Sequence, residues 1–216
     1  DAVACNYLRP KDELFAAASA ETCAHVLVRG QMVYSQSPDS SPAIEDTSEE
    51  VQEGQWLCEA ALWSEWTHVG KAESITSCQL LSIDSEHLMT CLQQDFLIEG
   101  IAVEYCRQFH KRITSAGPPH APWPTDLQVP FTDYCDLVVS MEKTVQQTIG
   151  RVALSQLQAQ RGGRAMEKLR EEVEISKSIV VITATGALIR VVSLVVLRAA
   201  QEDGSVFMQV GKWSGP

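Results

Sequence analysis

The sequence has no pair of cysteines at the C-x-x-C spacing and no pair of histidines at the H-x-H or H-x-x-x-H spacing. These absences argue against a zinc site of regular spacing. The seven cysteines are scattered and odd in number, so the pattern does not indicate a disulfide framework either. We therefore expect buried, reduced thiols in a cytosolic protein and no bound metal.

Basic residues are also scarce. Seventeen Lys and Arg stand against 28 Asp and Glu, which leaves a net charge of −11 over 216 residues. Nucleic acids and anionic membrane surfaces attract proteins through basic patches, so neither is expected as a partner. The length and the 45% hydrophobic content are sufficient for a sizeable core, in one domain or in two small ones.

The chain begins with Asp1, not with methionine, and no signal peptide is evident, so we expect it to be part of a longer protein. Residues 178–200 are long enough to cross a bilayer. However, Arg190 lies near their centre, at a cost of about 2.5–3.5 kcal/mol on insertion scales. The segment is rich in Val and Ile, so we expect a buried β-hairpin and no insertion of this segment into a membrane.

Short apolar runs separated by turns predict strands over residues 1–34, with Gly30 supplying the positive φ of the turn within residues 25–34. Residues 35–53 are rich in serine, proline and acidic residues and are predicted to be a solvated loop. Residues 72–83 read as a further strand. Helices are predicted from residue 84 or 85, with Asp84 or Ser85 as N-cap, and over about residues 95–114.

The proline-rich stretch at residues 115–130 marks a break, so the predicted organisation is 1–114, a linker at 115–130, and a small α+β unit at 131–216. The role of this last unit does not follow from its sequence. Its expected elements are a helical stretch over about 132–160, a loop at 161–163, a charged helix over 165–176, and strands over about 178–184, 188–198 and 205–212 with a turn at 203–204.

Residues 54–62, GQWLCEAAL, resemble the phosphate-binding cassette of the cyclic nucleotide-binding domain family, with the pattern G-x-x-F-G-E-[LIV]-A-L. Gly54, Glu59, Ala61 and Leu62 match it. Residues 13–34 resemble the opening strands of the family, and 77–88 resemble the strand and helix start that follow the cassette. The resemblance implies an α+β fold, an antiparallel β-roll of the jelly-roll type with C-terminal helices, for just under half of the chain.

In such a cassette the resemblance implies that backbone N–H groups and an arginine hold a cyclic phosphate, while a glutamate accepts the ribose hydroxyl. His68 falls at the position of the arginine, Cys58 at that of a glycine, and Val69 where channel members often have threonine. A histidine with an ordinary pKa near 6.5 is mostly neutral, so we expect the anion contact to be lost unless Lys71 compensates. The candidate ligand-binding residues are Gly54, Leu57, Cys58, Glu59, Ala60, Ala61, His68 and Val69.

Alternatives for these residues are structural. Glu59 can be a carboxylate at a helix start, and Trp56, Trp63 and Trp66 can be core or rim residues. In ether-à-go-go-type channels, which share the fold, a segment of the chain itself occupies the nucleotide position. Trp63, Trp66 or a residue of the second helix is the expected occupant here.

The function implied by the resemblance is a non-catalytic regulatory module. We expect it to be the cytosolic C-terminal region of a voltage-gated potassium or cation channel, on the cytoplasmic side of a membrane and able to oligomerise through its host. No cofactor is expected, and cyclic AMP or cyclic GMP is the possible ligand. The alternative is a regulatory or scaffold domain of a soluble signalling assembly, of the kinase regulatory subunit type, that binds these nucleotides. A thiol hydrolase based on Cys58 and His68 is disfavoured because no third orienting group is evident.

Overall fold

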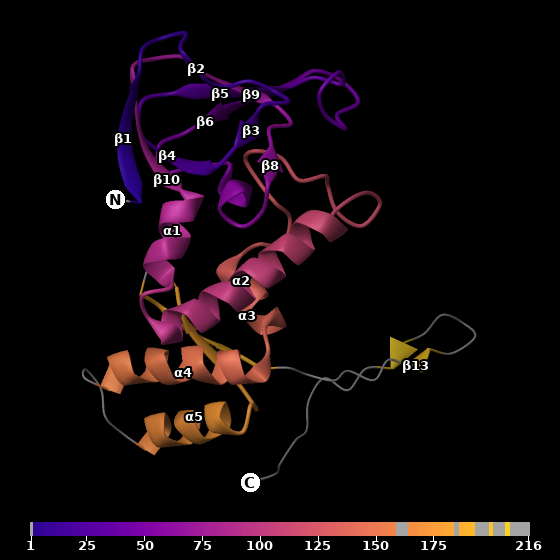
Figure 1. The fold of residues 1–216 in the computed structure, drawn as a ribbon. Helices are drawn as coiled ribbons and strands as arrows, with labels where there is room; N and C mark the ends of the chain where they lie inside the picture. Colours follow the sequence, from indigo (N-terminus) through magenta and orange to yellow (C-terminus); the bar gives the residue numbers. More distant parts are fainter. Residues whose placement is uncertain (1, 159–163, 184–185, 193–198, 201–205, 208–216) are drawn as a thin grey trace. The chain divides into compact units, whose positions relative to one another are not determined.

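A computed structural model describes the chain except for residues 1, 159–163, 184–185, 193–198, 201–205 and 208–216 (Figure 1). The chain forms two compact units, residues 1–145 and residues 146–216. The predicted α+β class is confirmed, with antiparallel sheets and several helices. No helix among the described residues is both long enough and apolar enough to cross a membrane.

The strands of the first unit pair only in antiparallel fashion, in three sheets. The first sheet has the order β1-β10-β4-β7, made of Val3–Leu8, Cys78–Asp84, Cys23–Arg29 and Trp56–Leu57. The second has the order β2-β9-β5-β6, made of Glu13–Phe15, Lys71–Ser74, Met32–Gln36 and Thr47–Val51. A short pair joins β3, Ala20–Glu21, to β8, Trp66–Thr67.

The core of this unit follows from the two-residue period of the strands. Met32 and Tyr34 of β5 are buried, as are Leu80 and Ser82 of β10, while the residues between them are more exposed. Gly30 connects β4 to β5 with φ of +105°, and a Cβ there would lie 2.6 Å from the carbonyl oxygen of Ser77. The turn predicted at this glycine is therefore present, although β4 and β5 belong to different sheets.

Helices follow directly from the last strand of the roll (Figure 1). Helix α1, Ser85–Leu92, begins at the predicted N-cap Asp84, whose carboxylate accepts a hydrogen bond from the backbone N–H of His87 at 2.9 Å. Helix α2, Phe96–Ser115, buries Phe109 completely. Trp63 packs against this helix, with its ring 4.8 Å from that of Tyr105.

The second unit contains most of helix α4, Lys143–Gln158, then helix α5, Arg164–Glu174. An antiparallel hairpin of β11, Ile179–Ile182, and β12, Leu188–Val191, follows, and β13, Ala199–Ala200, pairs with β14, Val206–Phe207. Its core brings α4, α5 and β11 together through Ala153, Leu154, Val173 and Val180. The predicted turn at 203–204 lies outside the described residues.

Two local predictions are wrong. The loop predicted over residues 35–53 contains strand β6, because Val51 is buried opposite Met32 and anchors an edge strand whose acidic residues face solvent. The single helix predicted over 132–160 is two helices, α3, Tyr134–Ser140, and α4. Met141 ends α3 with an extended backbone and buries its side chain, which turns the chain before α4 begins.

Candidate functional site

The candidate cassette folds as a loop that leads into one turn of helix. Gly54 has φ of +87°, and Cys58 has φ of 59° and ψ of 31°, in the left-handed region that favours glycine. A 3₁₀-helix, η1, Glu59–Leu62, follows, and its three apolar residues are buried. Of the predicted site residues, the structure buries Leu57, Cys58, Ala60, Ala61 and His68, half-buries Glu59 and Val69, and leaves Gly54 exposed.

The residue at the centre of this region is Asp126, which comes from the proline-rich segment after α2. Its side chain is 1% exposed. One carboxylate oxygen, Oδ2, accepts the hydroxyl of Tyr34 at 2.7 Å and the backbone N–H groups of Val69 and Gly70 at 3.0 and 2.9 Å. Two successive N–H groups and a hydroxyl therefore converge on one buried anionic oxygen.

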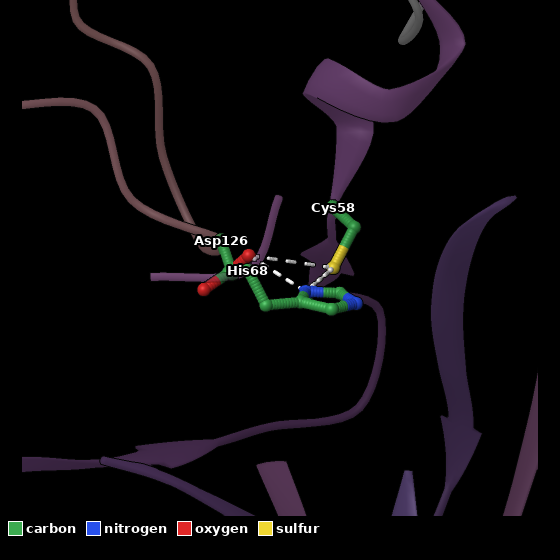
Figure 2. Close-up of side chains that lie close together, drawn as sticks. All are labelled: Cys58, His68 and Asp126. Atoms are coloured by element: carbon green, nitrogen blue, oxygen red, sulfur yellow. Dashed lines mark hydrogen bonds and ion pairs between the residues drawn. The ribbon is translucent and has the colours of Figure 1, made fainter. Parts of the chain in front are cut away.

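The other carboxylate oxygen, Oδ1, has two further donors. The indole Nε1 of Trp66 lies 2.7 Å from it. Nδ1 of His68 lies 2.8 Å from it, and this ion pair is drawn in Figure 2. The backbone carbonyl of Asp126 also accepts the N–H of Cys58 at 2.6 Å. A carboxylate with five donors is a fully satisfied buried anion, and charge-assisted hydrogen bonds of this kind are the strong ones.

His68 lies between two carboxylates. Its Nε2 is 3.3 Å from Glu21, opposite the Nδ1 contact with Asp126, and the ring stacks on Phe15 with centroids 3.8 Å apart. Burial lowers the pKa of His68, but its hydrogen bonds to Asp126 and Glu21 outweigh this and raise the pKa to about 9. The expectation that His68 is mostly neutral is therefore wrong, because both ring nitrogens face an acceptor and the imidazolium is favoured.

Glu21 extends the network to a second histidine. Its Oε2 is 3.3 Å from Nε2 of His25, and Nδ1 of His25 lies 2.7 Å from the hydroxyl of Ser82. Burial of Glu21 raises its pKa, but hydrogen bonds from His25 and His68 and from two backbone N–H groups hold it far below its ordinary value. Glu21 is therefore ionised and stabilises the charge on His68.

The thiol of Cys58 lies 3.5 Å from Nδ1 of His68 and 3.9 Å from Oδ1 of Asp126. Burial, and then the charge of Asp126, raise the pKa of Cys58 far above its ordinary value. The Nδ1 proton of His68 is already directed at Asp126, so this nitrogen is not free to accept the proton of the thiol. A protonated, 1% exposed sulfur is unsuited to nucleophilic attack on a substrate.

Lys71 does not turn inward. It forms ion pairs with Glu73 of its own strand, β9, at 2.8 Å and with Glu13 of the neighbouring strand β2 at 3.3 Å, and its side chain is 43% exposed. The suggested compensation by Lys71 is therefore wrong, and the cation of the site is His68.

Glu59 lies at the start of η1, and its burial raises the pKa of its carboxyl, against a smaller opposing effect of Trp63.

An open groove of about 820 Å³ borders this region, between β3, β8 and η1 on one side and α1 and α2 on the other. Its lining includes the aromatic rings of Trp63 and Trp66 and three acidic residues, Glu21, Glu65 and Glu86. No lysine or arginine is among the described residues that line it. This acidic lining is unfavourable for an anionic ligand.

No protein-family model matches the chain, and no curated protein matches it. Solved structures do match part of it. A cyclic nucleotide-binding-like protein from Brucella abortus is 22% identical over 42% of this chain and 76% of that chain, with a TM-score of 0.38. The N-terminal domain of a transcriptional regulator from Streptomyces coelicolor is 17% identical over 52% and 77%, with a TM-score of 0.43. The C-linker and CNBHD of zELK channels is 15% identical over 40% and 46%, with a TM-score of 0.33.

Sequence reasoning placed Cys58, His68 and Val69 in one site, and the structure brings them together around Asp126. It missed Asp126, Tyr34 and Glu21, and it named Trp63, Trp66 or α2 as the occupant of the site. In the structure, Trp66 donates its indole N–H to Asp126, and Trp63 packs on α2. The available signal was a lone acidic residue in the segment PWPTDLQV, which has no other charged residue.

Proposed function

We propose that this chain is a non-catalytic regulatory module with a degenerate cyclic nucleotide-binding fold, in which Asp126 replaces the bound anion. The observation that carries the proposal is the carboxylate of Asp126, which accepts five hydrogen bonds from the cassette and its neighbours. By the resemblance, His68 stands at the position of the phosphate-binding arginine. Asp126 thus meets the very group that a cyclic phosphate would require.

The proposed site is built for an anion and already contains one. Backbone N–H groups, a hydroxyl and an imidazolium favour negative charge, and a tethered carboxylate needs no translational entropy to reach them. A free nucleotide must displace Asp126 and enter beside the acidic residues of the groove. We therefore propose that the unmodified chain does not bind cyclic AMP or cyclic GMP. With Asp126 in the site, the module keeps one conformation, which we propose is the conformation that its host responds to.

The host that the resemblance favours is a voltage-gated potassium or cation channel, in which this module would lie on the cytoplasmic side of the membrane. The alternative, a module of a soluble kinase-type assembly that binds cyclic nucleotides, requires a site open to nucleotide. The buried ion pair between Asp126 and His68 favours the first proposal.

Calorimetric titration with cyclic AMP and cyclic GMP tests the proposal on three proteins. We expect no binding by the unmodified chain and measurable binding by Asp126→Ala, because the substitution frees all five donors. Asp39→Ala removes an exposed carboxylate of equal charge and serves as the matched control. Micromolar binding by the unmodified chain would contradict the proposal and support the soluble, nucleotide-responsive alternative.

A further inference from the structure

Three side chains with metal-ligating atoms meet inside the first unit. Sγ of Cys58, Nδ1 of His68 and Oδ1 of Asp126 all lie within 4.8 Å of one another, and all three residues are buried (Figure 2). The separations are 3.5 Å between sulfur and nitrogen, 3.9 Å between sulfur and oxygen, and 2.8 Å between nitrogen and oxygen. The three atoms belong to three segments, and each offers a different donor element.

These separations are close to those of a tetrahedral zinc site. Zinc lies about 2.3 Å from thiolate sulfur and about 2.0–2.2 Å from imidazole nitrogen or carboxylate oxygen, so the edges of the tetrahedron are about 3.3–3.6 Å. The sulfur–nitrogen edge already has this length. The nitrogen–oxygen edge must open by about half an ångström and the sulfur–oxygen edge must shorten slightly, which small side-chain rotations provide.

The surroundings of the three atoms are also those of metal ligands. A metal-bound histidine usually donates its other ring N–H to a carboxylate, and a metal-bound carboxylate is itself hydrogen-bonded. Nε2 of His68 faces Glu21, and the second oxygen of Asp126 accepts Tyr34 and two backbone N–H groups. The orientations of His68 and Asp126 are therefore fixed by contacts that do not involve Cys58.

The charges around the three atoms also suit a cation. Nδ1 of His68 faces the carboxylate of Asp126, and Nε2 faces the carboxylate of Glu21. A divalent cation bound to the thiolate form of Cys58 and to Asp126 would be offset by these two charges, with Glu21 as a further carboxylate beside the site. Metal ligands bind in their deprotonated forms, so binding of the ion would release protons to solvent.

We propose that Cys58, His68 and Asp126 form a binding site for a borderline-soft divalent cation, with zinc as the best match to this sulfur, nitrogen and oxygen set. The fourth position is taken by water or a further donor that enters with the ion. Resting on the proposed function, the cation would fasten the segment of Asp126 to the cassette and lock the site closed. Without the metal, only the hydrogen bonds of Asp126 would hold its segment against the cassette.

Titration of the purified chain with Co²⁺ in a metal-free buffer tests this site. We expect a thiolate-to-cobalt absorption band and tetrahedral d–d bands at one equivalent, release of protons on binding, and displacement by Zn²⁺. Cys58→Gly removes the sulfur at a left-handed position where glycine is the favoured residue, so the variant should fold. It should bind Co²⁺ at least tenfold more weakly and lose the thiolate band.

Cys5→Ser and Cys91→Ser, which remove exposed thiols, are the controls for adventitious binding and should keep the full signal. The proposal is overturned if the unmodified chain shows no thiolate band, or if the band survives in Cys58→Gly. These outcomes are independent of the nucleotide titration, since Asp126→Ala can gain nucleotide binding whether or not the unmodified chain binds metal. Failure of the metal site alone would leave the anion replacement intact.

Discussion

Nδ1 of His68 lies 2.8 Å from Oδ1 of Asp126, although 58 residues separate the two along the chain. This ion pair joins the cassette to the segment that follows the helices, and neither side chain is exposed by more than 2%. A buried pair is not by itself evidence of net stability, but removal of one partner leaves an uncompensated charge. Substitution of single groups around the pair therefore measures what each group contributes to the stability of the fold.

Removal of the Tyr34 hydroxyl tests how much one neutral donor contributes to the buried carboxylate. Tyr34→Phe keeps the ring but deletes the 2.7 Å hydrogen bond to Asp126. A hydrogen bond to a charged group contributes about 1.5–3 kcal/mol, so we expect a loss of this size in the free energy of unfolding from urea titration. Tyr7→Phe, at an exposed tyrosine of β1, should change it little. Equal effects of the two variants would argue against the site.

Gly70 is required by the close approach of its backbone to Tyr34. A Cβ at Gly70 would lie 2.5 Å from the Tyr34 ring and 2.6 Å from the carbonyl oxygen of Ser35. We expect Gly70→Ala to destabilise the chain by about 1–3 kcal/mol, as overpacking does. Gly100→Ala is the matched control in α2, where nothing lies within 4 Å, and it should stabilise by about 0.8–1 kcal/mol. If Gly70→Ala leaves the free energy of unfolding unchanged, the backbone of residue 70 does not approach the Tyr34 ring this closely.

The pH dependence of stability should reveal the charge on His68 in metal-free protein. Its pKa is raised from 6.5 to about 9 in the folded state. The protonated form is therefore favoured by folding, so the stabilisation is complete below pH 6.5 and declines as the pH rises through about 9. Urea titrations across this window in the presence of a chelator measure it. His68→Gln should flatten the profile, whereas His110→Gln, at an exposed position of α2, should leave it unchanged.

The second unit has its own core, which Leu154 tests. This side chain is 1% exposed and packs with Val173 and Val180. Leu154→Ala should cost about 2–5 kcal/mol. Hydrogen exchange should show faster exchange in α4, α5 and β11 and leave the protection of β4, β5 and β10 unchanged. Val152→Ala, at an exposed position in the same helix, is the control. Equal loss of protection in both units would show that they unfold together.

Local rules predicted much of the fold. Gly30 and Asp84 were recognised as a turn residue and an N-cap because each acts on backbone within three residues. Strand β6 was missed because its sequence, TSEEV, has only one apolar anchor. An edge strand is stabilised by backbone pairing with β5, which composition does not reveal.

The site was predicted only in part, for a similar reason. The cassette residues are consecutive or nearly so, and their pattern is visible in the sequence. Asp126 reaches the site through the tertiary fold, and its position among prolines predicted a linker. The charge of His68 was misjudged because an ordinary pKa describes an isolated side chain, while Asp126 and Glu21 supply the acceptors only in the folded chain.

The late position of Asp126 in the sequence has a consequence for the order of events during synthesis. Every strand of the roll and both of its helices, α1 and α2, are complete before residue 126 leaves the ribosome. From the end of the last strand at Asp84 to residue 126 there are 42 residues, so at about 5–20 residues per second the newly made roll presents its N–H groups, hydroxyl and histidine to the cell without their carboxylate for about 2–8 seconds. During that interval the nascent chain is the form most open to cellular anions, and translation itself closes it.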